Sequence, residues 1–408
     1  MPNNFENPTW IMNKFAARVH NKLAFAANVT RDYDDQFVVK GAKVGDTVYA
    51  RVPQLWDVTD GDDLVMQNVE DITVPVTITD HVHIGMNLTV REKMLNEDNF
   101  LERYVYGSAD KIANAIDQRG LQRMTRATYN HVGTPGTVPN ANSTYLNAGV
   151  KLTQLGAPQP RSVCLTAQML ATIMNANTAN FHPGGKLEKG WSLGTVVGPA
   201  LNIKEWWEDE NVNRHLIGTQ TGSPTVNGAN QTGTSMILQS TSASATFLEG
   251  NVVNFAGCNA VNPLSKQSTG QLADFRVTTD VTATAGGAVT LTIEPGIVTS
   301  GAQQNVTASP TNGGAVTIFG NANTNSGVTT AQGLLFHKSA YALVFADAPL
   351  FTSAAVAERV RDADLGISFT MHKQFRIGSF DEPCRIDAFF GWAAIRPAFG
   401  CRISSSAQ

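Results

Sequence analysis

The one local pattern in this sequence that could bind a metal ion is Asp80-His81-Val82-His83. On a β-strand, His81 and His83 would point to the same face, as in several β-barrel metal sites. A third ligand with a recognisable partner motif is missing, and His-x-His on a strand is common by chance. We therefore favour a partly exposed hairpin base over a metal site, and we predict neither a metal nor a cofactor.

A second cluster, Glu205-Trp206-Trp207-Glu208-Asp209-Glu210, places carboxylates beside two indoles. It superficially resembles a sugar-binding or glycosidase site. The simpler interpretation is an aromatic anchor with a solvated acidic face. The sequence also contains no GxSxG motif, no phosphate-binding glycine loop with its lysine, and no dinucleotide fingerprint. We predict that the chain is not an enzyme.

Charge and cysteine usage exclude further classes of protein. The formal net charge over 408 residues is −4, and no lysine- or arginine-rich run appears. A protein that recognises nucleic acid directly would normally carry such a run, although one that merely encloses DNA would not need it. The four cysteines share no CxxC spacing, which favours buried, reduced thiols over zinc or disulfides. No signal peptide or membrane-spanning stretch is evident, so we expect a cytosolic origin and no membrane partner.

The first 84 residues predict two projecting parts. Residues 1–41 form an N-terminal arm with a short helix, whose apolar residues Trp10, Ile11, Phe15, Val19, Leu23 and Phe25 fall near helical spacing. An acidic run, Asp32, Asp34 and Asp35, follows. Residues 42–84 form an extended β-hairpin loop from two alternating strands, Val44 to Val52 and Val69 to Ile84.

The tip of this hairpin carries Trp56, Asp57, Asp60, Asp62 and Asp63. A long hairpin cannot bury both faces on its own domain and usually packs on another subunit. We therefore predict that these five residues contact an adjacent subunit.

Residues 85–157 predict a domain built on a helix of about 97–131, with Asn96 or Asp98 as N-cap. Such a helix would be about 45 Å long, which suggests a structural spine. Residues 158–218 and 334–408 have a mixed α and β pattern, including a helix from Thr166 and a nearly wholly apolar strand from Cys384 to Ile395 that belongs at the centre of a sheet.

Residues 219–333 are almost without charge and are rich in Thr, Ser, Gly and Asn. Short β-prone runs separated by turn signals predict an inserted small β-barrel or sandwich, with a disordered linker as the alternative. Because the mixed pattern resumes after this insertion, we expect 158–218 and 334–408 to form one discontinuous domain. The fold class is α+β.

The carboxyl-terminal part carries a family resemblance. Leu335 to Leu343, Gly366 to Phe369, Cys384 to Ala388 and the closing run Phe390 to Pro397 with Cys401-Arg402-Ile403 resemble the end of the coat proteins of short-tailed, Salmonella-phage-type viruses. Val197-Gly198 with Leu201-Asn202-Ile203, and Lys111 to Asn114, are similar to further parts of that family. The resemblance implies the capsid-floor fold of tailed phages and herpesviruses, with N-terminal arm, extended loop, spine helix, peripheral and axial domains, and an inserted β-barrel.

The resemblance also implies a function. Such a chain is a major capsid protein that assembles with copies of itself, as hexamers and pentamers, into an icosahedral head around double-stranded DNA. A scaffolding protein, a portal protein at one vertex and, in some cases, a decoration protein would be its partners. It would assemble in the bacterial cytoplasm and end in the virion. We further expect Asp32, Asp34 and Asp35 to recruit a basic scaffolding protein. A secreted or surface β-rich adhesin is the alternative.

Overall fold

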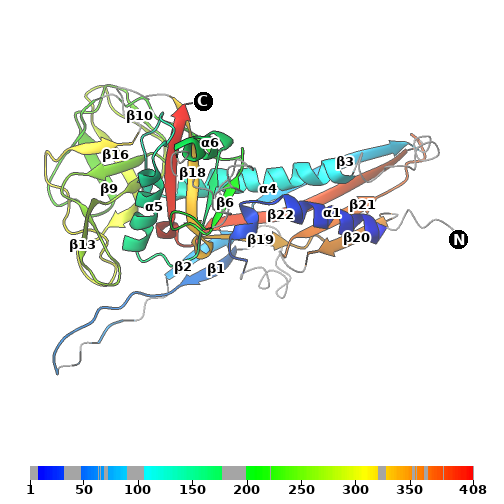
Figure 1. Cartoon of the computed structure of the whole chain (residues 1–408), viewed down its shortest axis with the longest axis horizontal. Coiled ribbons are helices and arrows are strands. Elements are labelled where there is room, and N and C mark those ends of the chain that lie inside the picture. The colour runs from blue at the N-terminus through cyan, green and yellow to red at the C-terminus, as the bar shows by residue number, and fades with distance from the viewer. Residues whose placement is uncertain are drawn as a thin grey trace, which may run out of the picture. The chain divides into compact units, whose positions relative to one another are not determined.

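The computed structural model of the chain describes residues 8–31, 47–62, 64, 66–68, 72–89, 105–176, 199–220, 222–319, 328–351, 354, 356–362, 366–379 and 381–407. Its elements are shown in Figure 1. The chain forms two compact units, of which the first comprises Met1–Ala50, Thr73–Gly120 and Tyr341–Ile395, and the second Arg51–Ile72, Leu121–Ala340 and Arg396–Gln408.

The first unit is built on a five-stranded antiparallel sheet whose central strand is β22. One edge of β22 pairs with β3, and its other edge pairs with β21 and then β19, while β20 extends the sheet beyond β21. The strands are β3 (Asp80–Thr89), β19 (Tyr341–Ala346), β20 (Val356–Arg361), β21 (Ser368–Lys373) and β22 (Asp381–Ala394). The central position predicted for the apolar run in β22 is confirmed, because other strands pair with both of its edges. Its backbone N–H and C=O groups therefore have partners within the sheet and need no water.

The helix of the N-terminal arm, α1 (Pro8–Lys22), packs on this sheet. Phe15 meets Phe369 edge to face at a centroid distance of 5.1 Å. Beyond the helix, the short 3₁₀ turn η1 (Ala26–Asn28) follows Phe25, whose ring stacks on Trp392 at 5.2 Å. Phe15, Val19, Leu23 and Phe25 of the predicted apolar stripe are therefore buried within the chain's own unit, whereas Ile11 is half-buried and Trp10 is 40% exposed.

The predicted spine helix is α4 (Tyr106–Ala127), which ends earlier than the expected boundary near residue 131. At this end the Met124 carbonyl accepts both the backbone amide of Thr128, at 3.1 Å, and the hydroxyl of the same residue, at 2.8 Å. The expected N-caps, Asn96 and Asp98, lie outside the described residues. Gly120 of α4 lies against Trp392, so close that an added Cβ would stand 2.4 Å from the indole ring.

The hairpin strand expected from Val69 to Ile84 is divided, so that prediction is wrong. β1 (Thr47–Val52) pairs with β2 (Ile72–Thr77), and β3 then joins the sheet of β22. Between β2 and β3 the backbone passes over Gly391, where the Thr77 carbonyl oxygen would lie 2.1 Å from an added Cβ. The absence of a side chain at Gly391 permits this crossing.

The second unit contains a sheet with the order β4-β23-β18-β5-β6, with β7 also pairing with β18. Its strands are β4 (His131–Val132), β5 (Arg161–Leu165), β6 (Glu205–Glu208), β7 (Asn213–Leu216), β18 (Thr329–His337) and β23 (Gly400–Ala407). The helices α5 (Asn142–Gln154) and α6 (Ala167–Ala176) share one apolar cluster with it. The Met169 amide donates to the hydroxyl of Thr166 at 3.3 Å, so the predicted cap of α6 is confirmed. β18, which follows the insertion, lies between β5, which precedes it, and β23.

The region 219–333 contains a β-barrel that is partly closed. Its six-stranded sheet has the order β17-β11-β14-β16-β9-β8, and an isolated bridge between Thr225 and Ala315 links the two end strands. The strands of this sheet are β8 (Thr225–Val226), β9 (Gly233–Gln239), β11 (Val252–Phe255), β14 (Phe275–Val277), β16 (Val289–Ile297) and β17 (Val316–Ile318). Two small pairs accompany it: β10 (Thr246–Phe247) with β15 (Val281–Thr282), and β12 (Asn259–Val261) with β13 (Ser268–Leu272). The predicted strands are confirmed and the linker alternative is wrong, since these strands enclose a core of their own around Phe247, Phe255 and Phe275.

All four cysteines are buried and none is in a disulfide, as predicted. Burial raises the pKa of Cys258 and of Cys384 to about 11, so both remain protonated thiols near neutral pH. In the described part of the chain, no helix combines the length and the apolar character needed to cross a membrane.

Candidate assembly surfaces

In the described part of the loop between β1 and β2, hydrogen bonds from side chains connect the two halves of the loop, and the backbones form no strand pairing. Gln54 donates from Nε2 to the carbonyl of Asn68 at 2.8 Å. Gln67 accepts the amide of Asp57 on Oε1 at 3.0 Å and donates from Nε2 to the carbonyl of the same residue at 2.5 Å. One glutamine thus satisfies both backbone groups of Asp57, as a paired strand residue would. Figure 1 shows this loop leading away from β1 and β2.

The loop exposes large apolar side chains. Trp56 is 56% exposed and Val58 is 92% exposed, and Leu64 and Met66 are exposed further along the loop. Of the predicted acidic residues, Asp60 and Asp62 are exposed, Asp57 is half-buried, and Asp63 lies outside the described residues. Apolar groups gathered on one exposed segment mark an interaction surface, because their burial against a partner is favourable. We call Pro53–Asn68 the apolar loop.

One flank of the apolar loop lies against the β-barrel. A depression of about 400 Å³ is lined by Gln54, Asp57 and Gln67 from the loop and by Ser300, Ala302 and Gln303 from the barrel, together with Thr59 and Asn68. The lining side chains are mostly polar. Neither Trp56 nor Val58 lines this depression, so both stay exposed on other sides of the loop.

A contrasting surface, the barrel junction, joins the barrel to α5 and β4. Its centre is Asp274, whose carboxylate forms an ion pair with Lys151, accepts the His131 amide at 2.8 Å, and accepts the Asn254 side-chain amide at 2.7 Å. The Asp274 side chain is 1% exposed. All of its partners supply N–H donors, so the buried carboxylate is well compensated.

A second link across the barrel junction starts from the buried Arg402 of β23. Its Nη1 donates to the carbonyl of Gly250 in the barrel at 2.7 Å. Nearby, Nε2 of His215 lies 2.8 Å from Oδ1 of Asn251. Burial, followed by the charge of Arg402, lowers the pKa of His215 to about 4, and the same two causes lower the pKa of His131 well below its usual value. Both imidazoles are therefore neutral near pH 7.

The two chemical clusters singled out from the sequence have different outcomes. Trp206 of β6 packs beside Tyr145 at 5.7 Å between ring centroids and joins the apolar cluster of α5 and α6. This geometry supports the aromatic anchor over a sugar site. His81 and His83 lie on β3, and Asp387 of β22 lies beside them, a third residue that the local sequence pattern could not reveal.

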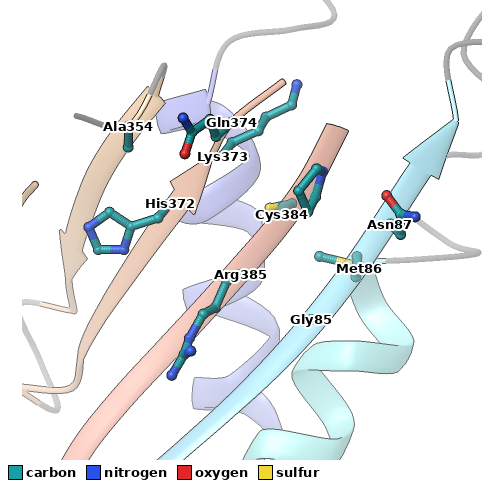
Figure 2. Close-up of a pocket in the computed structure, with 10 residues that line it drawn as sticks. Gly85, Met86, Asn87, Ala354, His372, Lys373, Gln374, Cys384 and Arg385 are labelled. Atoms are coloured by element: carbon teal, nitrogen blue, oxygen red, sulfur yellow. The ribbon is translucent and has the colours of Figure 1, made fainter. Parts of the chain in front are cut away.

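A shallow depression of about 400 Å³ lies on the first unit's sheet, across β3, β21 and β22 (Figure 2). Its lining includes His372, Lys373, Cys384 and Arg385. Lys373 forms an ion pair with Glu382 at 3.0 Å, and the Cys384 thiol has a raised pKa. A protonated thiol and a compensated lysine give this depression no activated nucleophile.

The acidic run Asp32, Asp34 and Asp35 lies outside the described residues, so its predicted role in recruiting a scaffold remains a prediction.

Solved structures similar to the chain include phage structures and a virus-like particle. The chain is similar to a structure from Mycobacterium phage Che8, with 14% identity, 93% of this chain and 90% of that chain covered, and a TM-score of 0.46. It is similar to the capsid of Ralstonia phage GP4 at 10% identity, with coverages of 90% and 85% and a TM-score of 0.44. A virus-like particle from Pyrococcus furiosus gives 8% identity, coverages of 98% and 99%, and a TM-score of 0.43. No curated protein matches the chain.

A family model described as the P22 coat protein, gene protein 5, matches residues 2–404. The chain is therefore of the tailed-phage major capsid class. Its mixed α+β character and its inserted, partly closed barrel are confirmed. Within that class, it belongs to the P22 coat protein family. This membership favours a structural role and opposes the adhesin alternative.

Proposed function

We propose that this chain is the major capsid protein that self-assembles, as hexamers and pentamers, into the icosahedral head enclosing a phage's double-stranded DNA genome. Assembly runs through a scaffolded procapsid that matures by expansion. The observation that carries the proposal is the apolar loop, which exposes Trp56 and Val58 to water on an isolated subunit. A neighbouring copy that covered them would gain about 25 cal/mol for each Å² of apolar surface removed from water.

The charges of the apolar loop give the contact its direction. Asp57, Asp60, Asp62 and Asp63 follow Trp56 closely in the sequence. A surface with basic groups on the adjacent subunit would meet them, and charges at the rim of a contact mainly set its rate and specificity. Many such contacts, each weak enough to reverse, add up to a stable shell while errors are corrected.

Electron microscopy of the full chain tests the proposal. We expect closed shells when the chain is produced together with the scaffolding protein of its own virus, and irregular shell-like particles when it is produced alone. Persistent monomers in both preparations would contradict the proposal.

The scaffolding protein is the partner that we assign to Asp32, Asp34 and Asp35. Contact between an acidic run and a basic scaffold weakens as salt rises, because ions screen exposed charges over about 8 Å at physiological ionic strength. Changing all three residues to Asn should lower the yield of scaffold-containing particles at low salt, with Asp280→Asn as a control in the barrel. Co-assembly insensitive both to salt and to these changes would sink the assignment.

The remaining partners follow from the same proposal. One vertex of the head holds a portal protein, and a decoration protein is a further candidate partner. The net charge of −4 suits an enclosed genome, because DNA would slide past a mildly acidic wall without adhering. The protein would assemble in the host cytoplasm and end in the virion.

A further inference from the structure

Two histidines and an aspartate meet on the first unit's sheet, on the face opposite to its buried side chains. In the antiparallel register of β3 and β22, His83 stands opposite Asp387 and His81 stands opposite Phe389. Ile386 and Phe390, which alternate with these positions along β22, are fully buried, so His81 and His83 project from the other side. One ligand atom from each of His81, His83 and Asp387 lies within 4.8 Å of the other two.

Each side chain in this cluster is positioned by its surroundings. Nε2 of His81 lies 2.6 Å from Oδ1 of Asp387. The His81 ring stacks on Phe389 at 4.1 Å between centroids and at an angle of 9°, and the His83 ring lies 5.6 Å from the His81 ring. The Asp387 side chain is nearly buried, which holds its carboxylate in place. Little rearrangement is needed for all three to face a common centre.

We propose that His81, His83 and Asp387 form a binding site for a divalent transition-metal ion of the zinc type. Two neutral imidazole nitrogens and one carboxylate oxygen are a donor set that suits Zn²⁺ and its neighbours, and they are not the all-oxygen set that Ca²⁺ or Mg²⁺ prefers. Three protein ligands leave one tetrahedral position for water or for a group from another molecule. A bound ion would tie the edge strand β3 to the central strand β22.

Arg385 competes with the metal for this site. It donates from Nε to both carboxylate oxygens of Asp387, at 2.8 and 2.9 Å, and its Nη2 lies 3.3 Å from Nε2 of His81. The guanidinium thus supplies the positive charge that a metal ion would bring. The Arg385 side chain is 48% exposed, so it can turn into water when an ion binds. Figure 2 shows Arg385 extending along the face of the sheet, away from Lys373.

This competition predicts opposite effects of two kinds of substitution on metal affinity, which a cluster that only stabilises the fold would not show. Removing a ligand should weaken metal binding, whereas removing Arg385 should strengthen it. A neighbouring cation repels a divalent ion even when water screens the two, and at about 4 Å this repulsion corresponds to about tenfold or more in affinity.

The test is calorimetric titration of the full-length chain with Zn²⁺ alone at pH 7.5. We expect one ion per chain, binding at least about tenfold weaker in His83→Gln and in Asp387→Asn, and about tenfold tighter in Arg385→Gln. His20→Gln is the matched control. His20 also forms a pair with an aspartate, Asp362, at 2.8 Å and is similarly exposed, but among the described residues it belongs to no cluster of three possible ligands. The control variant should bind Zn²⁺ as the unchanged chain does.

A melting experiment with the same variants separates binding from folding. A saturating ion should raise the melting temperature of the unchanged chain and of His20→Gln, because it binds only the folded state, and should not raise that of His83→Gln. Equal Zn²⁺ affinity in the unchanged chain and in His83→Gln would overturn the proposal. An unchanged Zn²⁺ affinity in Arg385→Gln would contradict the proposed competition between Arg385 and the metal ion. Both readouts are independent of shell assembly.

Discussion

The barrel junction and the apolar loop differ in which groups they bury: the junction buries a charged group together with its partners, whereas the loop leaves large apolar groups exposed. At the junction, the buried carboxylate of Asp274 accepts hydrogen bonds from a lysine, a backbone amide and an asparagine. In the loop, the large side chains of Trp56, Val58 and Met66 stand in water. The Asp274 carboxylate finds its partners within one chain, whereas we propose that another molecule covers the loop. On that proposal, the junction represents the contacts that fold a subunit and the loop represents those that join subunits.

This separation has a physical reason. A buried ion pair affects stability mainly because a structure that breaks it leaves a buried charge uncompensated. Such a pair suits a junction that forms once and persists. An exposed apolar surface adds nothing to the stability of an isolated subunit and gains its free energy on association. Changes at the two places should therefore affect different measurements.

The largest effect on the subunit is expected at Asp274. Asp274→Ala leaves the half-buried Lys151 without its carboxylate, and such a loss costs up to about 3–5 kcal/mol of unfolding free energy. Urea unfolding followed by fluorescence measures this loss. Glu249→Ala removes an exposed carboxylate from the same barrel and should change the free energy by less than about 0.5 kcal/mol. Equal losses in the two variants would contradict the role of the junction.

The junction should also make the subunit sensitive to acid. His215 has a folded-state pKa of about 4, whereas in the unfolded chain it titrates near its ordinary value of 6.5. Between these values the unfolded state binds more protons, so stability is full above pH 6.5 and falls as the pH drops towards 4, by about 3 kcal/mol for this residue. The lowered pKa of His131 acts in the same direction.

Urea unfolding at pH 7, 6, 5 and 4.5 measures this dependence as the difference between the unchanged chain and His215→Gln, which lacks the titrating ring. We expect the curve of the variant to be flatter over this range. Parallel curves would mean that His215 does not report on the junction.

A smaller effect is expected from Gln67, whose side chain bonds both backbone groups of Asp57. Gln67→Ala should cost the isolated subunit less than about 1 kcal/mol, because the freed backbone groups can bind water. Shell formation should slow, since a loosened apolar loop loses more conformational freedom on docking. Light scattering during assembly gives the rate, and Gln54→Ala, which removes a single bond at the base of the loop, should slow it less. An unchanged rate in Gln67→Ala would contradict the view that the loop is held ready for contact.

Much of the fold could be predicted from local patterns. The apolar run of β22 placed it at the centre of a sheet, Thr166 predicted the start of α6, and alternating apolar residues predicted the barrel strands. Alternation could not reveal the break between β2 and β3, because Val76, Ile78, Asp80 and Val82 are all buried and continue the period of two across the turn. The break falls where the backbone passes over Gly391.

The residues that meet at the barrel junction and at the His81–Asp387 cluster could not be predicted, because they come from distant parts of the chain. Asp274 meets Lys151 across 123 residues, and Asp387 meets His81 across 306. Such pairs depend on strand register and on the docking of the barrel, which only the folded chain defines. The apolar loop was predictable in part: its tryptophan and aspartates are local, but the exposure of Val58 and Met66 is a tertiary property.

The most direct test of the central claim pairs two measurements on one double variant, Trp56→Ala with Val58→Ser. We expect the isolated subunit to keep its melting temperature, while the yield of closed shells seen by electron microscopy falls sharply. The control is Leu146→Ala with Val150→Ser, which removes two exposed apolar side chains from α5. It should assemble as the unchanged chain does. Shells of normal yield and stability from the loop variant would contradict the claim that the apolar loop joins neighbouring subunits.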